Sequence, residues 1–341
     1  MKVKTGIVGV SGYAGLELVR LITRHPGVEL TTVMDAGEFT GKRLGEIHTS
    51  LRGVCDHVVE LPGTEWMTSL GLDTVFLCTP DKVSYELAPR ILSAGIRVID
   101  FSGAFRLKNA ASYPGWYGFD HTDAGLLEKA VYGLSEWNTR EIAPAQLIAN
   151  PGCYPTSIGL ALLPLIRAGL LETGSEIFCD CKSGVSGAGR SVKPEMMFVE
   201  ITGSFRPYSP VIHRHVPEMC QELGWDMENF TFVPHLLPIR QGIISTIYVK
   251  FNRQVGAEEL EAEYARRYDG RRFIRVLGSP RLPELSAVVS TNFCDIAWRL
   301  THNGKRAVIF SAIDNLFKGA SGQALQNFNI MHGFDETTGI L

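Results

Sequence analysis

A strand, a glycine turn and a helix open this chain, and they constrain its fold most strongly. A short apolar run around Ile7 ends in glycine, and Leu16, Val19 and Ile22 then recur at helical spacing. Glycines in such a turn allow close backbone approach, so the free N–H groups at the helix start can hold a pyrophosphate. The spacing G-x-x-G-x-x-G is a variant of the dinucleotide fingerprint, and a plain glycine-rich turn is the alternative. The expected cofactor contacts are Gly9, Ser11, Gly12, Tyr13, Ala14 and Gly15.

Strands and helices keep alternating up to residue 150. Strands are expected over 28–34, 73–79, 97–102 and 147–150, with a helix that starts near Asp81. This alternation predicts an α/β fold with a Rossmann-type, doubly wound parallel sheet. Residues 104–145 are rich in Gly, Pro, Tyr and Trp and lack regular periodicity, so we expect long loops there.

The chain changes character beyond residue 170. Strand-like runs cover 175–183, 242–251, 288–300 and 305–313, with one helix at 256–268. Strands with so few helices predict a second domain of the α+β type with a mainly antiparallel sheet. A length of 341 residues suits two domains, and we expect the helical end of the chain to pack back on one of them.

Charge and composition exclude several classes of partner. With 33 Lys and Arg against 36 Asp and Glu, the net charge is −3, which gives nucleic acid no basic surface. The longest apolar stretch, at 158–166, is interrupted by Pro164 and is too short for a membrane span. Seven irregularly spaced cysteines without a signal peptide indicate a soluble protein of the reducing cytoplasm. Because paired C-x-x-C elements are missing from the sequence, no metal site is expected.

Cys153 is the strongest candidate for a nucleophile. It lies in the motif NPGCYPT, which precedes an apolar helix, and proline is favoured in the first turn of a helix. The amino end of a helix favours the thiolate form of cysteine, which is the reactive form. The alternative is a small buried hydrophobic residue, an interpretation that suits Cys78 and Cys294 in apolar strands better.

A thiolate nucleophile needs an acid/base partner, and the motif HRHVPE supplies candidates. His213 and His215 provide two imidazoles close to the carboxylate of Glu218. One of these histidines with Cys153 would suit covalent acyl chemistry, and Glu218 could orient the ring. A surface cluster of His and Arg is the alternative, and a metal site at the two histidines lacks an evident third ligand.

Three further segments concern the binding of ligands, anions among them. Ser102 and Arg106 follow the end of the strand at 97–102, where parallel sheets bind ligands, and a guanidinium can clamp a phosphate. Glycine-rich loops at 183–190 and 319–323 indicate backbone contact with a ligand, and a merely flexible loop is the alternative at 183–190.

The end of the second strand bears on the choice of nicotinamide cofactor. Asp35 there favours the ribose hydroxyls of NAD, whereas the nearby Lys42 and Arg43 suit the additional phosphate of NADP. The signal is divided, and Asp35 as a solvated turn residue is the alternative.

Six motifs together resemble one family. GVSGYAG, DFSGAFRL, NPGCYPT, SGVSGAGR, HRHVPE and KGASGQALQN follow the order and approximate spacing of the N-acetyl-gamma-glutamyl-phosphate reductases, which are related to the aspartate-semialdehyde dehydrogenases. The resemblance covers nearly the whole chain. It implies a dinucleotide-binding Rossmann domain over 1–150 with a returning C-terminal helix at 315–341. It also implies a catalytic and oligomerisation domain over 151–314, and a homodimer or homotetramer.

The resemblance further implies an activity. The expected reaction is the NADPH-dependent reduction of N-acetyl-L-glutamyl 5-phosphate to N-acetyl-L-glutamate 5-semialdehyde and phosphate, in arginine biosynthesis. Cys153 would form a thioester, and His215 would be the acid/base. Alternatives are a reductase of carrier-protein-linked acyl phosphates in lysine or ornithine biosynthesis, and a non-catalytic nicotinamide-binding sensor. Further cofactor contacts are expected at Asp35, Ser186, Gly187 and Gly322, and substrate contacts at Ser102, Arg106, Asn150, Glu218 and Gln323.

Two positions depart from the family pattern. The family usually has an acidic residue where this chain has Ala104, which changes the surroundings of Arg106. It often has Ser or Ser-Arg where this chain has Asp35 and Ala36. An acid facing a 2′-phosphate is repulsive, so use of NAD or a reduced preference for NADP follows.

Overall fold

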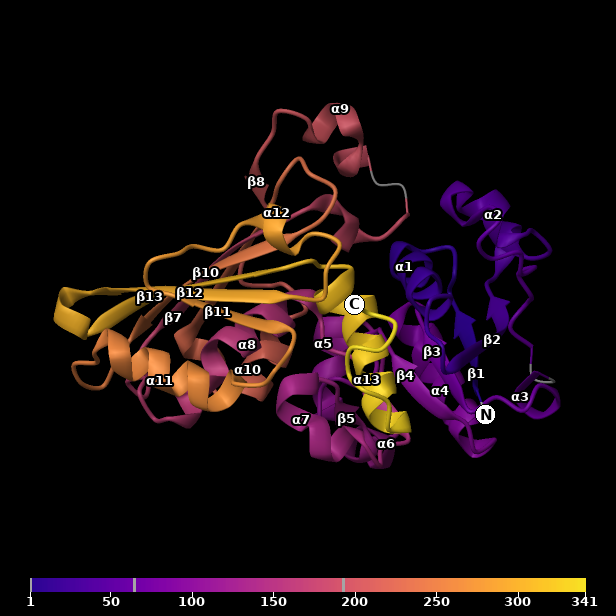
Figure 1. The fold of residues 1–341 in the computed structure, drawn as a ribbon, viewed down its shortest axis with the longest axis horizontal. Helices are drawn as coiled ribbons and strands as arrows, with labels where there is room; N and C mark the ends of the chain where they lie inside the picture. The colour runs from indigo at the N-terminus through magenta and orange to yellow at the C-terminus, as the bar shows by residue number, and fades with distance from the viewer. Residues whose placement is uncertain (1, 64–65, 192–193) are drawn as a thin grey trace. The chain divides into compact units, whose positions relative to one another are not determined.

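The chain folds into two compact units in the computed structural model, which describes residues 2–63, 66–191 and 194–341. One unit contains Met1–Gly152 and Ala320–Leu341, and the other contains Cys153–Gly319. Each unit is built around its own sheet (Figure 1).

The sheet of the first unit has six parallel strands in the order β2-β1-β3-β4-β6-β5. The predicted doubly wound parallel sheet is therefore confirmed, and the predicted strands are present with ends that differ by a few residues. The strands are β1 (Val3–Val8), β2 (Val28–Met34), β3 (Thr74–Leu77), β4 (Arg97–Asp100), β5 (Val131–Tyr132) and β6 (Leu147–Ala149).

The helices of the first unit include several that the sequence did not indicate. The prediction of long loops over 104–145 was wrong, because α5, α6, β5 and α7 lie there. These elements are too short to show periodicity, and their aromatic residues, such as Phe105 and Tyr113, belong to the apolar core. Helix α13 packs against α1 and α7. The helices are α1 (Tyr13–Ile22), α2 (Leu44–Ile47), α3 (Trp66–Ser69), α4 (Asp81–Ser93), α5 (Tyr113–Tyr117), α6 (Ala124–Lys129), α7 (Ser135–Ile142) and α13 (Gly322–His332).

The second unit has a mixed, mainly antiparallel sheet of seven strands in the order β11-β12-β13-β10-β7-β9-β8. Among the strands that the structure describes in this unit, only β7 with β9 and β11 with β12 pair in parallel, so the expected sheet type is confirmed. The strand expected over 288–300 begins only at Cys294, because the chain first forms α12 (Leu285–Val288). The strands are β7 (Ile177–Ser183), β8 (Arg206–Pro207), β9 (Phe230–Leu236), β10 (Ile243–Lys250), β11 (Ile274–Gly278), β12 (Cys294–Thr301) and β13 (Arg306–Ile313).

Helix α8 (Cys153–Arg167) is the central helix of the second unit. It packs against β10 and β13 and against the helices α10 (Val216–Leu223) and α11 (Ala257–Tyr268). Pro164 within it has no N–H to donate to the carbonyl of Leu160, and the hydroxyl of Tyr268 donates to that carbonyl instead, at 2.6 Å. The exchange keeps a buried polar group paired.

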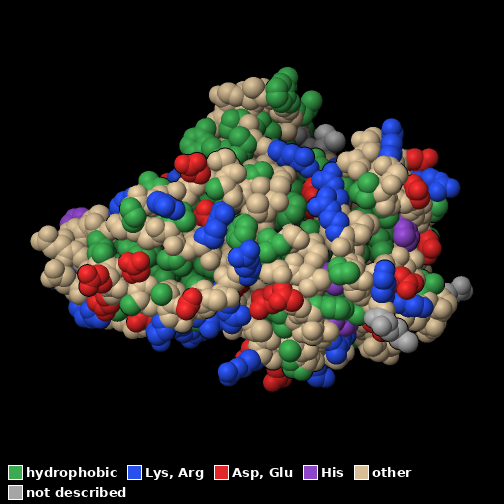
Figure 2. Space-filling model, viewed as in Figure 1, with side chains coloured by type: hydrophobic (Ala, Val, Ile, Leu, Met, Phe, Trp, Pro, Cys, Tyr) green, Lys and Arg blue, Asp and Glu red, His purple; other side chains and the backbone are tan. Residues whose placement is uncertain are grey.

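Apolar side chains gather on the surface of the second unit around α9 (Phe198–Ile201) (Figure 2). Phe198 and Val199 are 79% and 72% exposed there. No helix among the described residues is long and apolar enough to cross a membrane. All seven cysteines lie in the described ranges, and none of them forms a disulfide.

The glycine turn after β1 gives a test of the fold. Gly9 has a φ of +90°, and a Cβ there would meet the carbonyl group of Cys78. Gly41 has a similar φ of +82° but open space around it. We expect Gly41→Ala to cost about 1 kcal/mol of unfolding free energy, and Gly9→Ala about 2 kcal/mol more, because only Gly9 adds a steric clash to the backbone strain. Denaturant unfolding without cofactor measures both, and equal losses would contradict the close approach.

Candidate active site

Cys153 is the first residue of α8, as its motif predicts, and its side chain is partly exposed. The helix runs for 15 residues. The N–H groups of its first turn have no carbonyl partner within the helix, and its dipole places partial positive charge at this end. Both effects favour an anion at the position of the Cys153 sulfur.

A cavity of about 550 Å³ opens at Cys153, and all of its lining residues belong to the second unit. Among the predicted site residues, it brings together Cys153, His215 and Gly187. The other lining residues are Tyr154, Ser183, Gly184, Ala188, Ser191, Met196, Tyr208, Ser209, Ile212, His213, Arg214 and Leu236.

The two histidines of the cavity have different environments. The backbone N–H of His215 donates to Nδ1 of His213 at 3.1 Å, so Nδ1 of His213 must carry no proton. Burial and the charge of Arg214 lower the pKa of His213 to about 4, in agreement with this role. His215 is buried and occupies the residue position directly before α10, with its ring centroid 4.7 Å from that of His213. His213 is therefore a neutral residue that fixes the backbone of His215.

Two tyrosines in the cavity were not among the predicted site residues. The hydroxyl of Tyr208 donates to the hydroxyl of Tyr154 at 2.8 Å. Burial raises the pKa of both hydroxyls, so both stay protonated at neutral pH. Tyr154 stands inside NPGCYPT and could have been found there, whereas Tyr208 has no motif that marks it.

The glycine-rich loop at 183–190 forms one wall of the cavity. The backbone N–H groups of Gly184 and Ser186 donate to the carbonyls of Gly242 and Arg240. A Cβ on Gly184 would lie 2.6 Å from the backbone nitrogen of Gln241, so glycine permits this contact. Glu218, by contrast, is fully buried in the first turn of α10 and is not one of the described residues that line the cavity.

The predicted dinucleotide turn lies in the first unit and has a shape that fits a pyrophosphate. A Cβ on Gly15 would lie 2.5 Å from the carbonyl oxygen of Gly9, so the turn requires glycine. Gly12 caps α1 without a side-chain acceptor, which leaves the first N–H groups of the helix available to an anion. Asp35 accepts hydrogen bonds from the backbone N–H groups of Ser11 and Ala36, each at 2.8 Å. Its carboxylate thus braces the turn and is not a purely solvated residue.

The predicted substrate residues Ser102, Arg106 and Asn150 also lie in the first unit, where backbone and carboxylate contacts fix them. Arg106 donates to the carbonyls of Phe101 and Asn150, and the hydroxyl of Ser102 donates to Asp100 at 2.7 Å. Burial raises the pKa of Asp100 to about 6.

Three more positions from the sequence analysis lie in the first unit. Ala104, the position where the family usually has an acid, is fully buried in the apolar core. Gly322 and Gln323 are buried at the start of α13. Among the described residues, no group of three or more His, Cys, Asp or Glu side chains is arranged to hold a metal ion.

Comparison with known proteins agrees with this architecture. Residues 4–145 match the family described as semialdehyde dehydrogenase, NAD binding domain, and residues 153–315 match semialdehyde dehydrogenase, dimerisation domain. Solved structures with the same fold include a probable aspartate-semialdehyde dehydrogenase from Pseudomonas aeruginosa, at TM-score 0.73 and 18% identity over 97% of this chain and 99% of that one. Aspartate semialdehyde dehydrogenase with NADP from Candida albicans has TM-score 0.69 and 15% identity over 97% and 99%. The chain is thus in the class of semialdehyde dehydrogenases.

Sequence relatives narrow the class. The N-acetyl-gamma-glutamyl-phosphate reductase of Halorhodospira halophila is 44% identical over 99% of this chain and 98% of its own length. That of Laribacter hongkongensis is 42% identical over the same shares. The chain belongs to the N-acetyl-gamma-glutamyl-phosphate reductase family of oxidoreductases, as the motifs predicted.

The low pKa of His213 predicts a pH dependence of stability. The folded state binds a proton at His213 only near pH 4, whereas the unfolded state binds it near pH 6.5. Protons therefore favour the unfolded state, and His213 lowers the stability as the pH falls from 6.5 to 4. We expect His213→Gln to lose less unfolding free energy than the parent across this window, by about 1–3 kcal/mol. Urea unfolding measures this difference. Equal losses of unfolding free energy in the parent and in His213→Gln between pH 6.5 and 4 would contradict a buried, neutral His213.

Proposed function

We propose that this chain reduces N-acetyl-L-glutamyl 5-phosphate to N-acetyl-L-glutamate 5-semialdehyde and phosphate, with NADPH, in arginine biosynthesis. The observation that carries the proposal is the cavity in which Cys153, at the start of α8, shares its walls with His215. The names of the relatives, at 42% and 44% identity over nearly full length, supply the substrate.

The chemistry assigned to the cavity is covalent acyl transfer. The thiolate of Cys153 attacks the acyl carbon, the bond to phosphate breaks, and a thioester forms. A reduced nicotinamide supplies the hydride that reduces this thioester when it is bound. His215 gives a proton to the oxygen of the resulting thiohemiacetal and takes it back as the C–S bond breaks, which releases the aldehyde and restores the thiolate of Cys153. His213 does not take this role, because its Nδ1 accepts the backbone N–H of His215.

Cofactor and substrate contacts are assigned to the residues that the sequence motifs single out. The turn Gly9–Gly15 with Asp35, Ser186, Gly187 and Gly322 would hold the cofactor. Arg106 and Ser102, with Asn150, Glu218 and Gln323, would hold the acyl phosphate. The resemblance favours NADP, and the charge of Asp35 favours NAD. A homodimer or homotetramer in the cytoplasm is proposed, supported by the match of 153–315 to a dimerisation domain.

Loss of the thiol tests the nucleophile. We expect Cys153→Ser to lose at least about a thousandfold in kcat, because a serine hydroxyl forms its anion far less readily than a thiol. Cofactor affinity should change little. Cys220→Ser is the matched control, since that thiol is buried in α10 and burial raises its pKa to about 12. The assay runs in reverse, with the semialdehyde, phosphate and NADP.

Particular outcomes would overturn these assignments. Near-parental activity of Cys153→Ser would exclude the thioester route. Turnover of carrier-bound acyl phosphate but not of the free compound would identify the carrier-linked reductase. Cofactor binding without turnover of either substrate, and without a covalent acyl adduct, would identify a sensor.

Asp35 provides a test of cofactor preference. Removing its negative charge removes repulsion against a 2′-phosphate, so Asp35→Ser should raise the ratio of kcat/KM for NADP over NAD about tenfold or more. Asp35→Asn is the matched control for the brace, because it keeps an acceptor for the N–H of Ser11 while removing the charge. Both variants should shift the ratio, and a ratio that stays at the parental value in both would show that the charge does not select the cofactor.

A further inference from the structure

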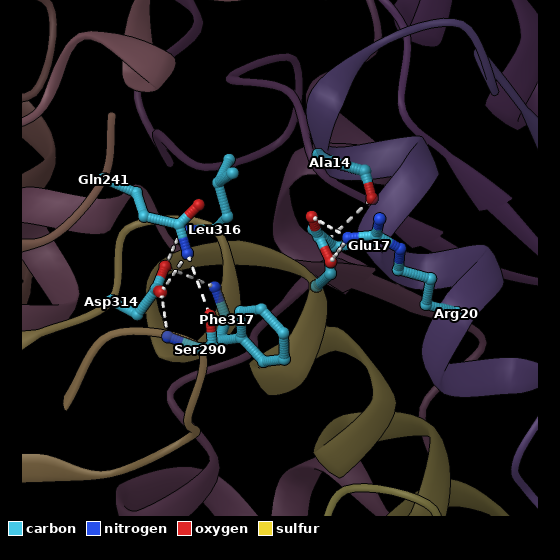
Figure 3. Close-up of polar contacts among 9 residues, drawn as sticks. Ala14, Glu17, Arg20, Gln241, Ser290, Asp314, Leu316 and Phe317 are labelled. Atoms are coloured by element: carbon cyan, nitrogen blue, oxygen red, sulfur yellow. Dashed lines mark hydrogen bonds and ion pairs between the residues drawn. The ribbon is translucent and has the colours of Figure 1, made fainter. Parts of the chain in front are cut away.

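Asp314 is a fully buried carboxylate that accepts four N–H groups (Figure 3). It follows β13 directly. One oxygen, Oδ2, accepts the side-chain amide of Gln241 and the backbone N–H of Ser290, each at 2.6 Å. The other, Oδ1, accepts the backbone N–H groups of Leu316 and Phe317 at 2.7 and 3.2 Å. A buried carboxylate is costly unless it is hydrogen-bonded, and this one has donors on both oxygens.

The contacts of Oδ1 lead to Cys153. They fix the start of the π-helical turn Phe317–Ser321, and the N–H of Gly319 closes this turn on the carbonyl of Asp314 at 2.9 Å. A Cβ on Gly319 would lie 2.7 Å from Cβ of Cys153 and 3.1 Å from its Cα. The turn therefore packs directly against the backbone of Cys153.

The contacts of Oδ2 lead to the glycine-rich wall of the cavity. Gln241 lies between the two carbonyls, of Arg240 and Gly242, that hold the wall residues Ser186 and Gly184. The neighbouring Asn315 strengthens the same link. Its side chain accepts the N–H of Gly242 at 2.7 Å and donates to the hydroxyl of Ser186 at 2.9 Å.

We propose that Asp314 is a positioning residue that sets the distance between Cys153 and the wall at 184–187. The carboxylate of Asp314 is hydrogen-bonded both to the turn that packs against Cys153 and to Gln241, whose neighbours hold the wall at 184–187. Asp314 is not one of the described lining residues, so it acts on the cavity through these two segments. Asparagine cannot replace it, because its NH₂ group would face two N–H donors. The inference deepens the proposed function, on which its kinetic consequence rests.

The test compares Asp314→Asn with Asp295→Asn. Asp295 is a matched control because it is also a buried carboxylate of the second unit, bonded to Arg275 at 2.5 Å. Two quantities are measured at a temperature where both variants are folded. One is the pH profile of iodoacetamide alkylation of Cys153, read on its own peptide by mass spectrometry. The other is kcat and KM in the reverse assay. Thermal unfolding reports stability separately.

We expect Asp314→Asn to change the alkylation rate of Cys153 at least threefold and to lower kcat at least tenfold, with KM changed less. Asp295→Asn should lose stability but keep the parental alkylation rate of Cys153 and the parental kcat. Gln241→Met, which keeps Asp314 and removes one donor, should show a smaller loss in kcat. The inference fails if the alkylation profile and kcat of Asp314→Asn match those of Asp295→Asn. It also fails if neither Asp314→Asn nor Gln241→Met folds, because Asp314 is then only structural. If the protein does not catalyse the proposed reaction, the alkylation profile still tests whether Asp314 positions Cys153, because alkylation does not require turnover.

Discussion

Helix α8 is buried along almost its whole length against β10, β13, α10 and α11, and the position of Cys153 follows from this packing. Three serines mediate the contact with the sheet, as Ser157 bonds to Ser245 and Ser311 at 2.9 and 3.0 Å. Their hydrogen bonds fix the rotation of the helix, because a turn about its axis would leave buried hydroxyls unpaired. The first residue of such a helix has a defined place, which covalent chemistry requires.

The walls around this fixed point come from backbone rather than from large side chains. Gly184 and Gly319 each allow a segment to approach more closely than any Cβ would permit. The position of such a backbone wall depends on the contacts that hold its segment in place. Here those contacts come from buried side chains that follow β13. Asp314 and Asn315 are adjacent in sequence, yet one ties the turn at Cys153 and the other ties Ser186. Two residues at the end of one strand thus link two parts of the cavity that lie far apart in the sequence.

Sequence patterns predicted those parts of this molecule that depend on interactions between residues close together in the sequence. Cys153 at a helix start follows from proline and from the apolar run after it, and the parallel sheet follows from regular alternation. Strand β9 was missed because Pro234 interrupts it, although its side chains alternate between buried and half-buried. Reasoning from the residues alone did not separate His213 from His215, which only the resemblance did, since the fold is what places the N–H of His215 on the ring of His213. Asp314 has local partners in Leu316 and Phe317, but its other partners, Ser290 and Gln241, lie 24 and 73 residues away, and no sequence pattern indicates that link.

Seven cysteines in one chain raise the question of what makes a single thiol reactive. Burial raises the pKa of Cys78, Cys179, Cys181 and Cys220, and the thiol form of these residues is a poor nucleophile. Cys181 lies on β7, whose last residue, Ser183, lines the same cavity as Cys153, so a position near the cavity does not by itself make a thiol a good nucleophile. What distinguishes Cys153 is partial exposure together with the N–H groups of a helix end. The packing that encloses α8 leaves its first residue open to the cavity, and this exposure is what the proposed role of Cys153 as the nucleophile requires.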